Sequence, residues 1–452
     1  MSQGLTPIEK RTALSLAGVY GLRMFGLFLI MPVLATYGQS LAGFSPLWVG
    51  IAIGAYGLTQ GILQIPAGIA SDRFGRKRVI AAGLLLFALG SLVAALADSI
   101  YVVALGRALQ GAGAIASAVL ALASDLTRDE QRPKVMAIIG SFIGLSFMVA
   151  LVAGPALAGW IGINGLFGLT AVLALGALAV MQFVVPNAVQ KAPTRDLVAV
   201  PARLKALLKD PQLLRLDISI LILHMLITAI FVALPLALVS AGLVADRHWT
   251  LYLPAMVLAL VLMVPILLYG VKRGQTRGPF LFAIALMGLA ALLMLTQLDS
   301  VWGLSAAVVL FFAGLNYLEA ALPSLISRLS PPGDKGSAMG IYSTAQFFGA
   351  FAGGLLGGVL YTHLGAQGVF ALCCGAIALW FVLMWGMQEP RKVRSVTLDA
   401  PLYDPARAQS LAGQLSELPG VVEVVLIPEQ KAAYLKVEDP FDIEAAKAAL
   451  TA

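Results

Sequence analysis

Twelve long apolar stretches divide this chain of 452 residues, and its basic residues concentrate on every second loop between them. Up to Arg394, 23 Lys and Arg residues lie on one set of loops, whereas the opposite set carries one, Arg247. Because loops rich in Lys and Arg stay on the cytoplasmic side of a membrane, this asymmetry predicts a multi-pass membrane protein with both termini in the cytoplasm. Only two further basic residues, Arg23 and Arg107, lie inside the stretches, where a charge is costly.

The composition agrees with a membrane protein and excludes several other classes. Charged residues make up 12% of the chain, against about 25% in soluble domains, and the mean hydropathy is +0.90. The net charge of +7 does not indicate a nucleic-acid partner, because the cations flank apolar segments and face an anionic leaflet. The two cysteines, Cys373 and Cys374, are adjacent, so we expect no disulfide, no metal site and no cofactor.

Each stretch is long enough to cross a bilayer as a helix, which takes ~20 apolar residues and satisfies its own backbone hydrogen bonds. We therefore expect an all-α membrane protein with twelve transmembrane helices. The expected spans are 14–37, 46–70, 79–97, 100–124, 135–160, 164–186, 216–241, 248–271, 279–298, 301–327, 337–361 and 367–388.

The chain also repeats itself at an offset of 203 residues. Equivalent pairs at this offset are Pro32 and Pro235, Gly75 and Gly278, and Met136 and Met339. We infer two six-helix halves, 1–186 and 216–390, joined by a cytoplasmic linker, 187–215. Parallel repeats of this kind place a binding site between the halves near the middle of the membrane. The alternative is chance similarity between apolar helices.

Residues 391–452 have the composition of a soluble domain. Their pattern predicts the order β-α-β-β-α, a small ferredoxin-like fold that lacks its final strand. The Leu418-Pro419-Gly420-Val421 turn resembles that of heavy-metal-associated domains, but these residues include no cysteine, so the resemblance does not extend to metal binding. A regulatory or ligand-sensing module and a passive stabilising appendage both stay open.

The loop after the second span carries the most specific motif, Gly-Ile-Ala-Ser-Asp-Arg-Phe-Gly-Arg-Lys-Arg over residues 68–78. It resembles the signature loop of the major facilitator superfamily. The residues that carry the match are Gly68, Asp72, Arg73, Gly75, Arg76 and Lys77. Charge and position suggest that Arg76 reaches Asp125 at the end of span 4. The resemblance implies that this network latches the halves on the cytoplasmic side, with Asp72 at the start of span 11. The alternative, a plain positive-inside loop, does not explain Asp72 or the glycines.

Two further segments resemble motifs of the same family. Arg107-Ala-Leu-Gln110-Gly111 in span 4 is similar to a motif whose arginine is implicated in proton coupling. Residues 154–159, with Gly154, Pro155 and Gly159, are similar to the motif of drug/proton antiporters but depart from it at Ala158. The alternative for the second segment is a packing and kink motif with no bearing on the direction of transport.

The resemblance implies that spans 1, 4, 7 and 10 line a central cavity, and each of them holds one ionisable residue. These residues are Arg23, Arg107, His224 and Glu319. A carboxylate that is removed from water is easier to protonate, which makes Glu319 the first candidate for a proton site. His224 is the second, because an unperturbed histidine titrates near pH ~6.5.

Each of these residues also has a purely structural interpretation. Glu319 could be held permanently by Asn316, one turn earlier, and His224 by Thr228. Arg23 could bind helix carbonyls and only shape the cavity, and Arg107 could have a structural role.

These observations predict a proton-coupled secondary transporter of the bacterial inner membrane that exports small molecules by antiport and acts as a monomer. A symporter or uniporter of the same fold is the first alternative. The second is a membrane-anchored sensor that acts through residues 391–452. We do not expect an enzyme, because the sequence contains no nucleophile with its base, no phosphate-binding loop and no metal cage.

Overall fold

The computed structural model describes residues 4–128, 131–186, 206–331, 335–389, 394–399, 405–427, 432–438 and 440–451. Within these ranges, 10 helical segments are long and apolar enough to cross a membrane. Two of them are each a pair of helices joined at a glycine with positive φ, Gly162 and Gly365. The bundle therefore has the twelve predicted spans.

The first six spans comprise seven helices, because spans 1 and 4 are interrupted and spans 5 and 6 form one helix. They are α1 (Pro7–Leu29), α2 (Leu34–Tyr37), α3 (Pro46–Phe74), α4 (Arg76–Ala95), α5 (Ile100–Ala112), α6 (Ala116–Asp125) and α7 (Arg132–Phe183). The last six spans comprise five elements, because spans 11 and 12 both lie in α13. They are α9 (Pro211–Ser240), α10 (His248–Arg273), α11 (Arg277–Thr296), α12 (Val301–Leu329) and α13 (Lys335–Trp385).

Several helices begin where the sequence supplies a cap. Thr6 and Glu9 form a capping box at the start of α1. Ser45, Ser99 and Ser300 each accept a hydrogen bond from a backbone N–H in the first turn of the helix that follows. These caps satisfy backbone donors that would otherwise stay unpaired at the helix ends.

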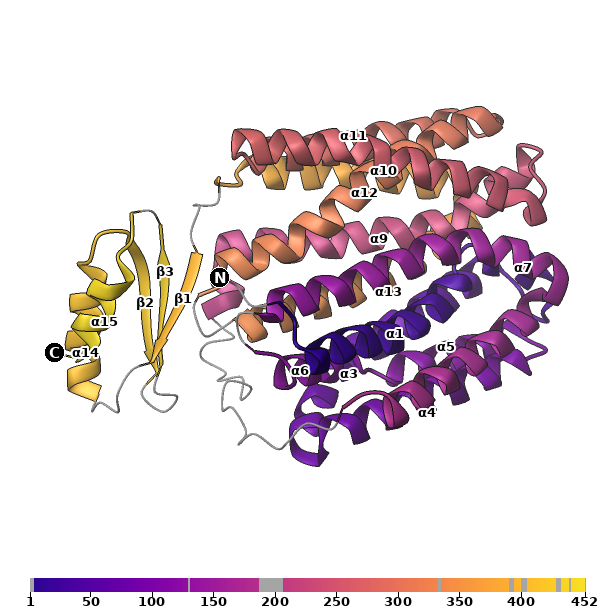
Figure 1. The fold of residues 1–452 in the computed structure, drawn as a ribbon. Coiled ribbons are helices and arrows are strands. Elements are labelled where there is room, and N and C mark those ends of the chain that lie inside the picture. Colours follow the sequence, from indigo (N-terminus) through magenta and orange to yellow (C-terminus); the bar gives the residue numbers. More distant parts are fainter. Residues whose placement is uncertain are drawn as a thin grey trace.

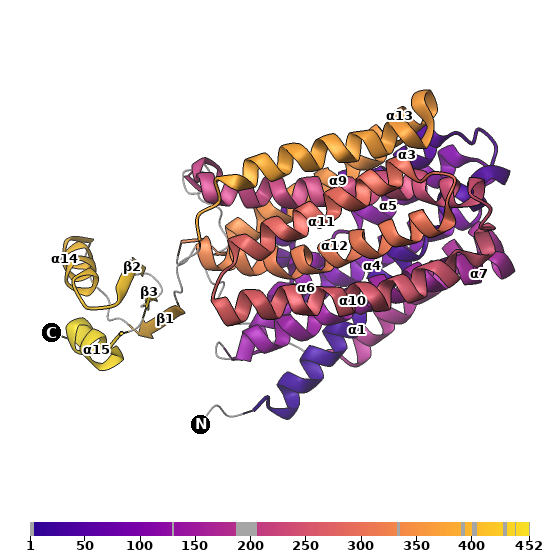
Figure 2. The same cartoon turned by 90° about the horizontal axis from the view of Figure 1, so that it is seen from above.

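The helices lie side by side along one common direction (Figures 1 and 2). We call the end of the bundle beside the soluble domain the near end; α1 begins there and α3 ends there. The opposite end, with loops 38–45 and 241–247, is the far end. The basic motif loop after α3 and residues 206–215 both belong to the near end. Of the predicted linker, 187–205 lie outside the described residues.

Each half of the bundle has its own apolar core. One core consists almost entirely of residues from α9 to α13, and two others of residues from α1 to α7. Three of the buried core side chains cross between the halves: Met31 and Leu151 pack in the core of the second half, and Val232 packs in a core of the first. These crossings lie toward the far end, so the halves are joined there.

Glycines let α3 and α13 touch through their backbones in the half of the membrane next to the far end. A Cβ atom added at Gly54 would lie 2.9 Å from the Phe351 carbonyl oxygen, and one at Gly57 would lie 2.6 Å from that of Phe347. Gly50 and Gly354 face each other in the same seam. Small residues at such positions allow helices to pack closely in a bilayer. The seam closes the far end of the space between the halves.

The soluble domain has the predicted order β-α-β-β-α. Its elements are β1 (Arg394–Asp399), α14 (Pro405–Ser416), β2 (Val421–Ile427), β3 (Ala432–Val437) and α15 (Ile443–Thr451). The strands form one antiparallel sheet in the order β1-β3-β2. Leu415, Ala446 and Leu450 from the helices pack against Leu398 and Leu435 of the sheet. Both helices lie on the side of the sheet away from the bundle (Figure 1).

We predict that Gly354→Ala lowers the thermal stability of the protein by disturbing the far-end seam. Its new Cβ would lie 2.9 Å from the Gly54 nitrogen, and overpacking of this kind typically costs about 1–3 kcal/mol. Gly375→Ala is the matched control, because a Cβ at that position of the same helix meets nothing within 4 Å. Thermal unfolding in detergent checks this: equal midpoints for the two variants would contradict the packing seam.

Candidate functional site

A polar cluster from three helices lies inside the second half of the bundle. His224 of α9 and Glu319 of α12 approach to 3.5 Å between Nε2 and Oε1. Gln346 of α13 lies against the same ring nitrogen at 2.8 Å. The Glu319 side chain is 37% exposed and that of His224 is 19% exposed, although both lie well within their helices. The cluster is therefore reachable in this state of the protein.

Aromatic rings separate this cluster from the far end. Phe147 of α7 packs on Phe28 of α1 with ring centroids 4.9 Å apart and on Phe312 of α12 at 6.0 Å. Phe231 of α9 adds a further contact to Phe312 at 6.4 Å. Phe312 precedes Glu319 by two helical turns, roughly 10 Å toward the far end. The rings come from both halves of the bundle and lie toward the far end from Glu319.

The structural alternatives considered for these two residues are not observed. Among the described residues, the Asn316 Nδ2 is buried without a hydrogen-bond partner, so it does not hold Glu319 through that group. The Thr228 hydroxyl donates to the backbone carbonyl of His224, not to its ring. The other ring nitrogen, His224 Nδ1, is buried and has no partner among the described residues. Neither Asn316 Nδ2 nor the Thr228 hydroxyl therefore holds the side chain that it was expected to hold.

Arg23 lies in the core of the first half and is fully buried. Its NH2 donates to Gln60 Oε1 at 2.8 Å and to the Gly113 carbonyl at 3.0 Å. Gly113 is where span 4 breaks between α5 and α6, and a break frees carbonyl groups that need a donor. The guanidinium also lies over the Phe87 ring at 5.1 Å. Arg23 therefore binds a carbonyl at the break in span 4.

Arg107 is 2% exposed and contacts the same aromatic ring as Arg23. Its Nε donates to the Ala52 carbonyl at 3.3 Å and its NH1 to Gln110 Oε1 at 2.9 Å. Both guanidinium groups lie over Tyr56, Arg107 at 5.2 Å and Arg23 at 5.8 Å from the ring centroid. Amide oxygens, carbonyls and π faces hold the two arginines, and no carboxylate is in contact with either within the described part of the chain.

The motif loop at the near end forms the predicted contact between Arg76 and Asp125. Arg76 Nε lies 3.2 Å from Asp125 Oδ2, and its NH1 contacts both Asp72 and the Ser71 hydroxyl. Gly75 adopts a φ of 97° between α3 and α4, a conformation that favours glycine. The start of α4 is thereby held against the end of α6.

The remaining motif residues occupy the same end of the bundle. Lys77 donates to the Val185 carbonyl at 2.6 Å, Gly68 lies next to Ser117 of α6, and Arg73 lies over the Phe74 ring at 5.9 Å. The expected contact of Asp72 with the start of span 11 is not among the contacts of the described residues, and 332–334 lie outside them. The role of these residues as a latch between the halves therefore stays a prediction.

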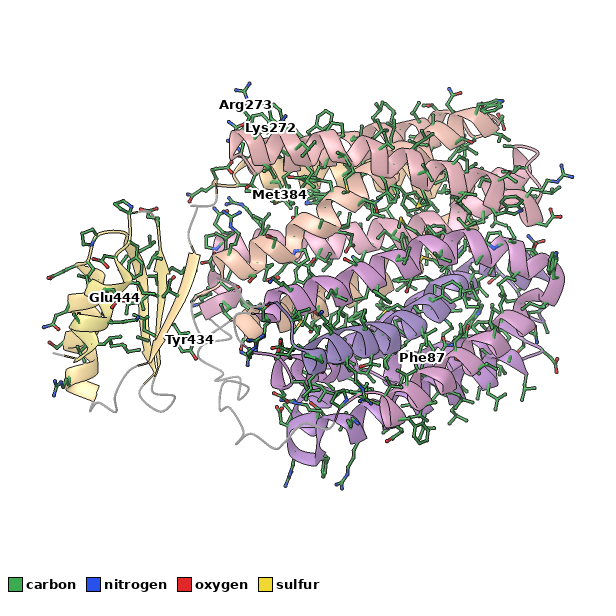
Figure 3. The ribbon with its side chains drawn as sticks, in the orientation of Figure 1. Phe87, Lys272, Arg273, Met384, Tyr434 and Glu444 are labelled. Carbon is green, nitrogen blue, oxygen red and sulfur yellow. The ribbon has the colours of Figure 1, made fainter. Side chains whose placement is uncertain are left out.

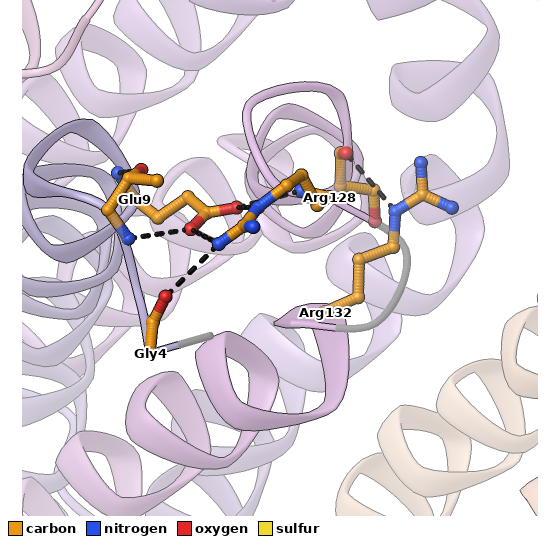
Figure 4. Close-up of polar contacts among 6 residues, drawn as sticks. Gly4, Glu9, Arg128 and Arg132 are labelled. Atoms are coloured by element: carbon orange, nitrogen blue, oxygen red, sulfur yellow. Dashed lines mark hydrogen bonds and ion pairs between the residues drawn. The ribbon is translucent and has the colours of Figure 1, made fainter. Parts of the chain in front are cut away.

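A second ion pair reinforces this end of the first half (Figure 4). Glu9 of α1 accepts hydrogen bonds from Arg128 Nε and NH2, both at 2.8 Å, and from the Arg128 backbone nitrogen at 3.1 Å. The Glu9 side chain is buried, and Arg128 also donates to the Gly4 carbonyl. The pair ties α1 to the loop after α6. Charge-assisted bonds of this bidentate kind are among the stronger polar contacts.

The antiporter-like segment lies where the halves meet at the far end. Gly154 packs against α1, since an added Cβ would lie 2.6 Å from the Leu29 carbonyl oxygen. Pro155 lies inside α7, and Gly159 lies next to Tyr37 and Asp246, the latter from the second half. These contacts give the segment a packing role at the closed end.

Sequence reasoning missed three residues that complete the site. Gln346 is the hydrogen-bond partner of His224, Tyr56 lies between the buried arginines, and Phe147 joins the halves through aromatic contacts. Gln346 was visible as a polar residue in an apolar helix, one turn after Tyr342. Within the described residues, no group of three or more His, Cys, Asp and Glu side chains could hold a metal ion.

Comparison with known proteins identifies the family. The profile of the Major Facilitator Superfamily matches residues 16–317 and 256–403. The chain is 43% identical over 446 residues to the inner membrane transport protein YajR of Escherichia coli K12, which covers 98% of each chain. It is 28% identical over 358 residues to the multidrug resistance protein MdtH of Aeromonas salmonicida, covering 76% of this chain and 86% of MdtH.

Solved structures show the same fold. The crystal structure of the human organic anion transporter MFSD10 superposes with a TM-score of 0.61 at 20% sequence identity, covering 84% of this chain and all of that one. Relatives and fold are those of membrane transporters and not of enzymes.

Proposed function

Since the chain belongs to the major facilitator superfamily of small-molecule transporters, we propose that it exports small molecules across the bacterial inner membrane in exchange for protons. The near end then faces the cytoplasm, as the excess of Lys and Arg on its loops favours. The names of two relatives support this assignment, one being an inner membrane transport protein and the other a multidrug resistance protein.

The contact between His224 and Glu319 is the observation that carries the proposal. A carboxylate and an imidazole 3.5 Å apart, inside a membrane bundle, can exchange or share a proton. Glu319 is partly exposed, so a proton or a substrate arriving from the near end can reach it. Ionisable residues at such depth are expensive and usually mark proton or substrate pathways.

In the proposed cycle, protonation of Glu319 and binding of substrate are alternatives. With Glu319 ionised, the cluster carries a negative charge that is available to substrate or to His224. A proton from the far side neutralises Glu319, removes that interaction and favours the state of the bundle that is open at the near end. Release of the proton at the near end restores the negative charge of Glu319. Substrate then binds, and the bundle returns to the state that is open at the far end.

The two buried arginines are proposed to keep the first half rigid and positively charged during this cycle. Arg23 binds the Gly113 carbonyl between α5 and α6, Arg107 binds the Ala52 carbonyl of α3, and each also binds a side-chain amide, so they link the helices of that half to one another. Arg107 is thereby assigned a part in coupling through the rigidity of the half that holds it, and not through contact with a carboxylate.

The near-end network of Asp72, Arg76 and Asp125 is proposed as one side of a latch between the halves. In this structure the three side chains pair within the first half. When the near end closes, Asp72 would approach the N-terminus of α13, where a carboxylate is stabilised by the helix dipole. The latch would then set the balance between the two states of the bundle.

We predict that Glu319→Gln abolishes transport driven by a pH gradient, because an amide cannot bind and release the coupling proton. The solute is first identified by a screen for compounds that stabilise the purified protein. Its flux under a pH gradient is then measured in proteoliposomes, and Glu444→Gln on the soluble domain serves as the control. Undiminished gradient-driven flux in Glu319→Gln would remove Glu319 from the mechanism. The sign of proton movement on addition of solute to the wild type separates antiport from symport.

A second prediction concerns the latch. Asp72→Asn should lower turnover and increase the share of molecules that are open at the near end, because an amide loses the charge that the α13 N-terminus would stabilise. Labelling of a cysteine at Ser141, an exposed α7 residue close to the near end, measures that share. The same labelling rate in Asp72→Asn and in the parent protein would argue against the latch.

A further inference from the structure

Cationic side chains cap the ends of several transmembrane helices at the near end. The last carbonyls of a helix have no partner within it, and a positive charge next to them is favourable. Arg11 donates to Val184 at the end of α7, at 2.8 Å, and Arg277 donates to Trp385 at the end of α13, at 2.6 Å. Each of these donors comes from a different element of the bundle than the helix that it caps.

At the end of α12 the soluble domain supplies such a donor. Lys436 of β3 donates from its Nζ to the carbonyl of Leu329, the last residue of α12, at 3.2 Å. The same Nζ lies 3.2 Å from Glu423 Oε2 on the neighbouring strand β2. One ammonium group thus joins the sheet of the soluble domain to the transmembrane helix that carries Glu319.

The burial of Lys436 fits a docking contact. Ala433, Leu435 and Val437 of β3 face the domain's own helices, so Lys436 and Tyr434 lie on the opposite face of the sheet. That face points toward the bundle, whereas Glu444 lies on the helical side away from it (Figure 3). Lys436 nevertheless has a side chain only 7% exposed, against 54% for Lys447 on α15.

We propose that Lys436 docks the soluble domain on the near end of α12, so that the domain moves with the second half of the bundle and stabilises the last turns of that helix. The partner of this surface is α12 of the same chain, recognised through the partial negative charge of its C-terminus. Glu423 orients the ammonium group toward it. This inference is independent of the proposed function, because it concerns the attachment of the domain and not the proton site.

Distance measurements between spin labels test the docking directly. Labels at Ser410 of α14 and Lys272 of α10, both exposed, report on the domain relative to the second half after replacement of Cys373 and Cys374 by Ala. The wild type should give one narrow distance distribution. Lys436→Met keeps the length of the side chain but removes the charge, and should broaden the distribution.

The controls separate docking from folding. Lys447→Met removes an exposed lysine of the same domain and should leave the distribution narrow. Lys436→Arg keeps a cationic donor, so its distance distribution should also stay narrow. In a separate measurement, hydrogen exchange of the last turns of α12 should become faster in Lys436→Met alone. A broad distribution in the wild type, or a narrow one in Lys436→Met, would overturn the proposal. So would broadening in Lys436→Arg with native exchange protection of the sheet.

Discussion

The backbone contact between α3 and α13 holds the two halves of the bundle together toward the far end. Where Gly54 and Gly57 face Phe351 and Phe347, no side chain separates the two helices, and the halves of the bundle close on each other. Helices in lipid gain little from apolar burial against each other, so close packing at small residues supplies the attraction. In the proposed mechanism this closure leaves Glu319 accessible from the near end.

The two halves differ in the charge that they bury. The first half encloses Arg23 and Arg107, held by carbonyls, amides and aromatic faces. The second half places Glu319 and His224 together, with Gln346 beside them. The two repeats of the sequence therefore have similar helical folds but carry different ionisable residues. In the proposed mechanism the second half carries the proton, and the first half provides a fixed positive environment.

Much of the fold follows from local sequence signals, and the contacts between distant segments do not. Hydropathy and loop charge predicted the twelve spans, because the bilayer requires ~20 apolar residues for each. The order of strands and helices in the soluble domain was also predicted from the sequence pattern, and the structure has the same order. The pairing of Arg76 with Asp125 was predicted from charge and position, and the structure contains it. The ionisable residues inside the spans were identified because charge is rare there.

What could not be predicted depends on which face of a helix meets which neighbour. In an apolar span, lipid-facing and protein-facing residues look alike, so Gln346 and Tyr56 were not connected with His224 and the arginines. The packing of α3 on α13 was not predictable either, since glycines are frequent in many of the apolar spans. The contact of Lys436 with Leu329 joins residues that are 107 positions apart and has no local signature.

The central claim is that the halves pivot about the Glu319 site, so that one end closes as the other opens. Spin-label distances in nanodiscs test it most directly, with one pair across the far end, at Ser40 and Ser240, and one across the near end, at Arg78 and Lys272, all exposed positions. Acidification through the range in which carboxylates and histidines titrate should change the two distances in opposite directions. Distances that do not respond, or that change in the same direction, would contradict the account.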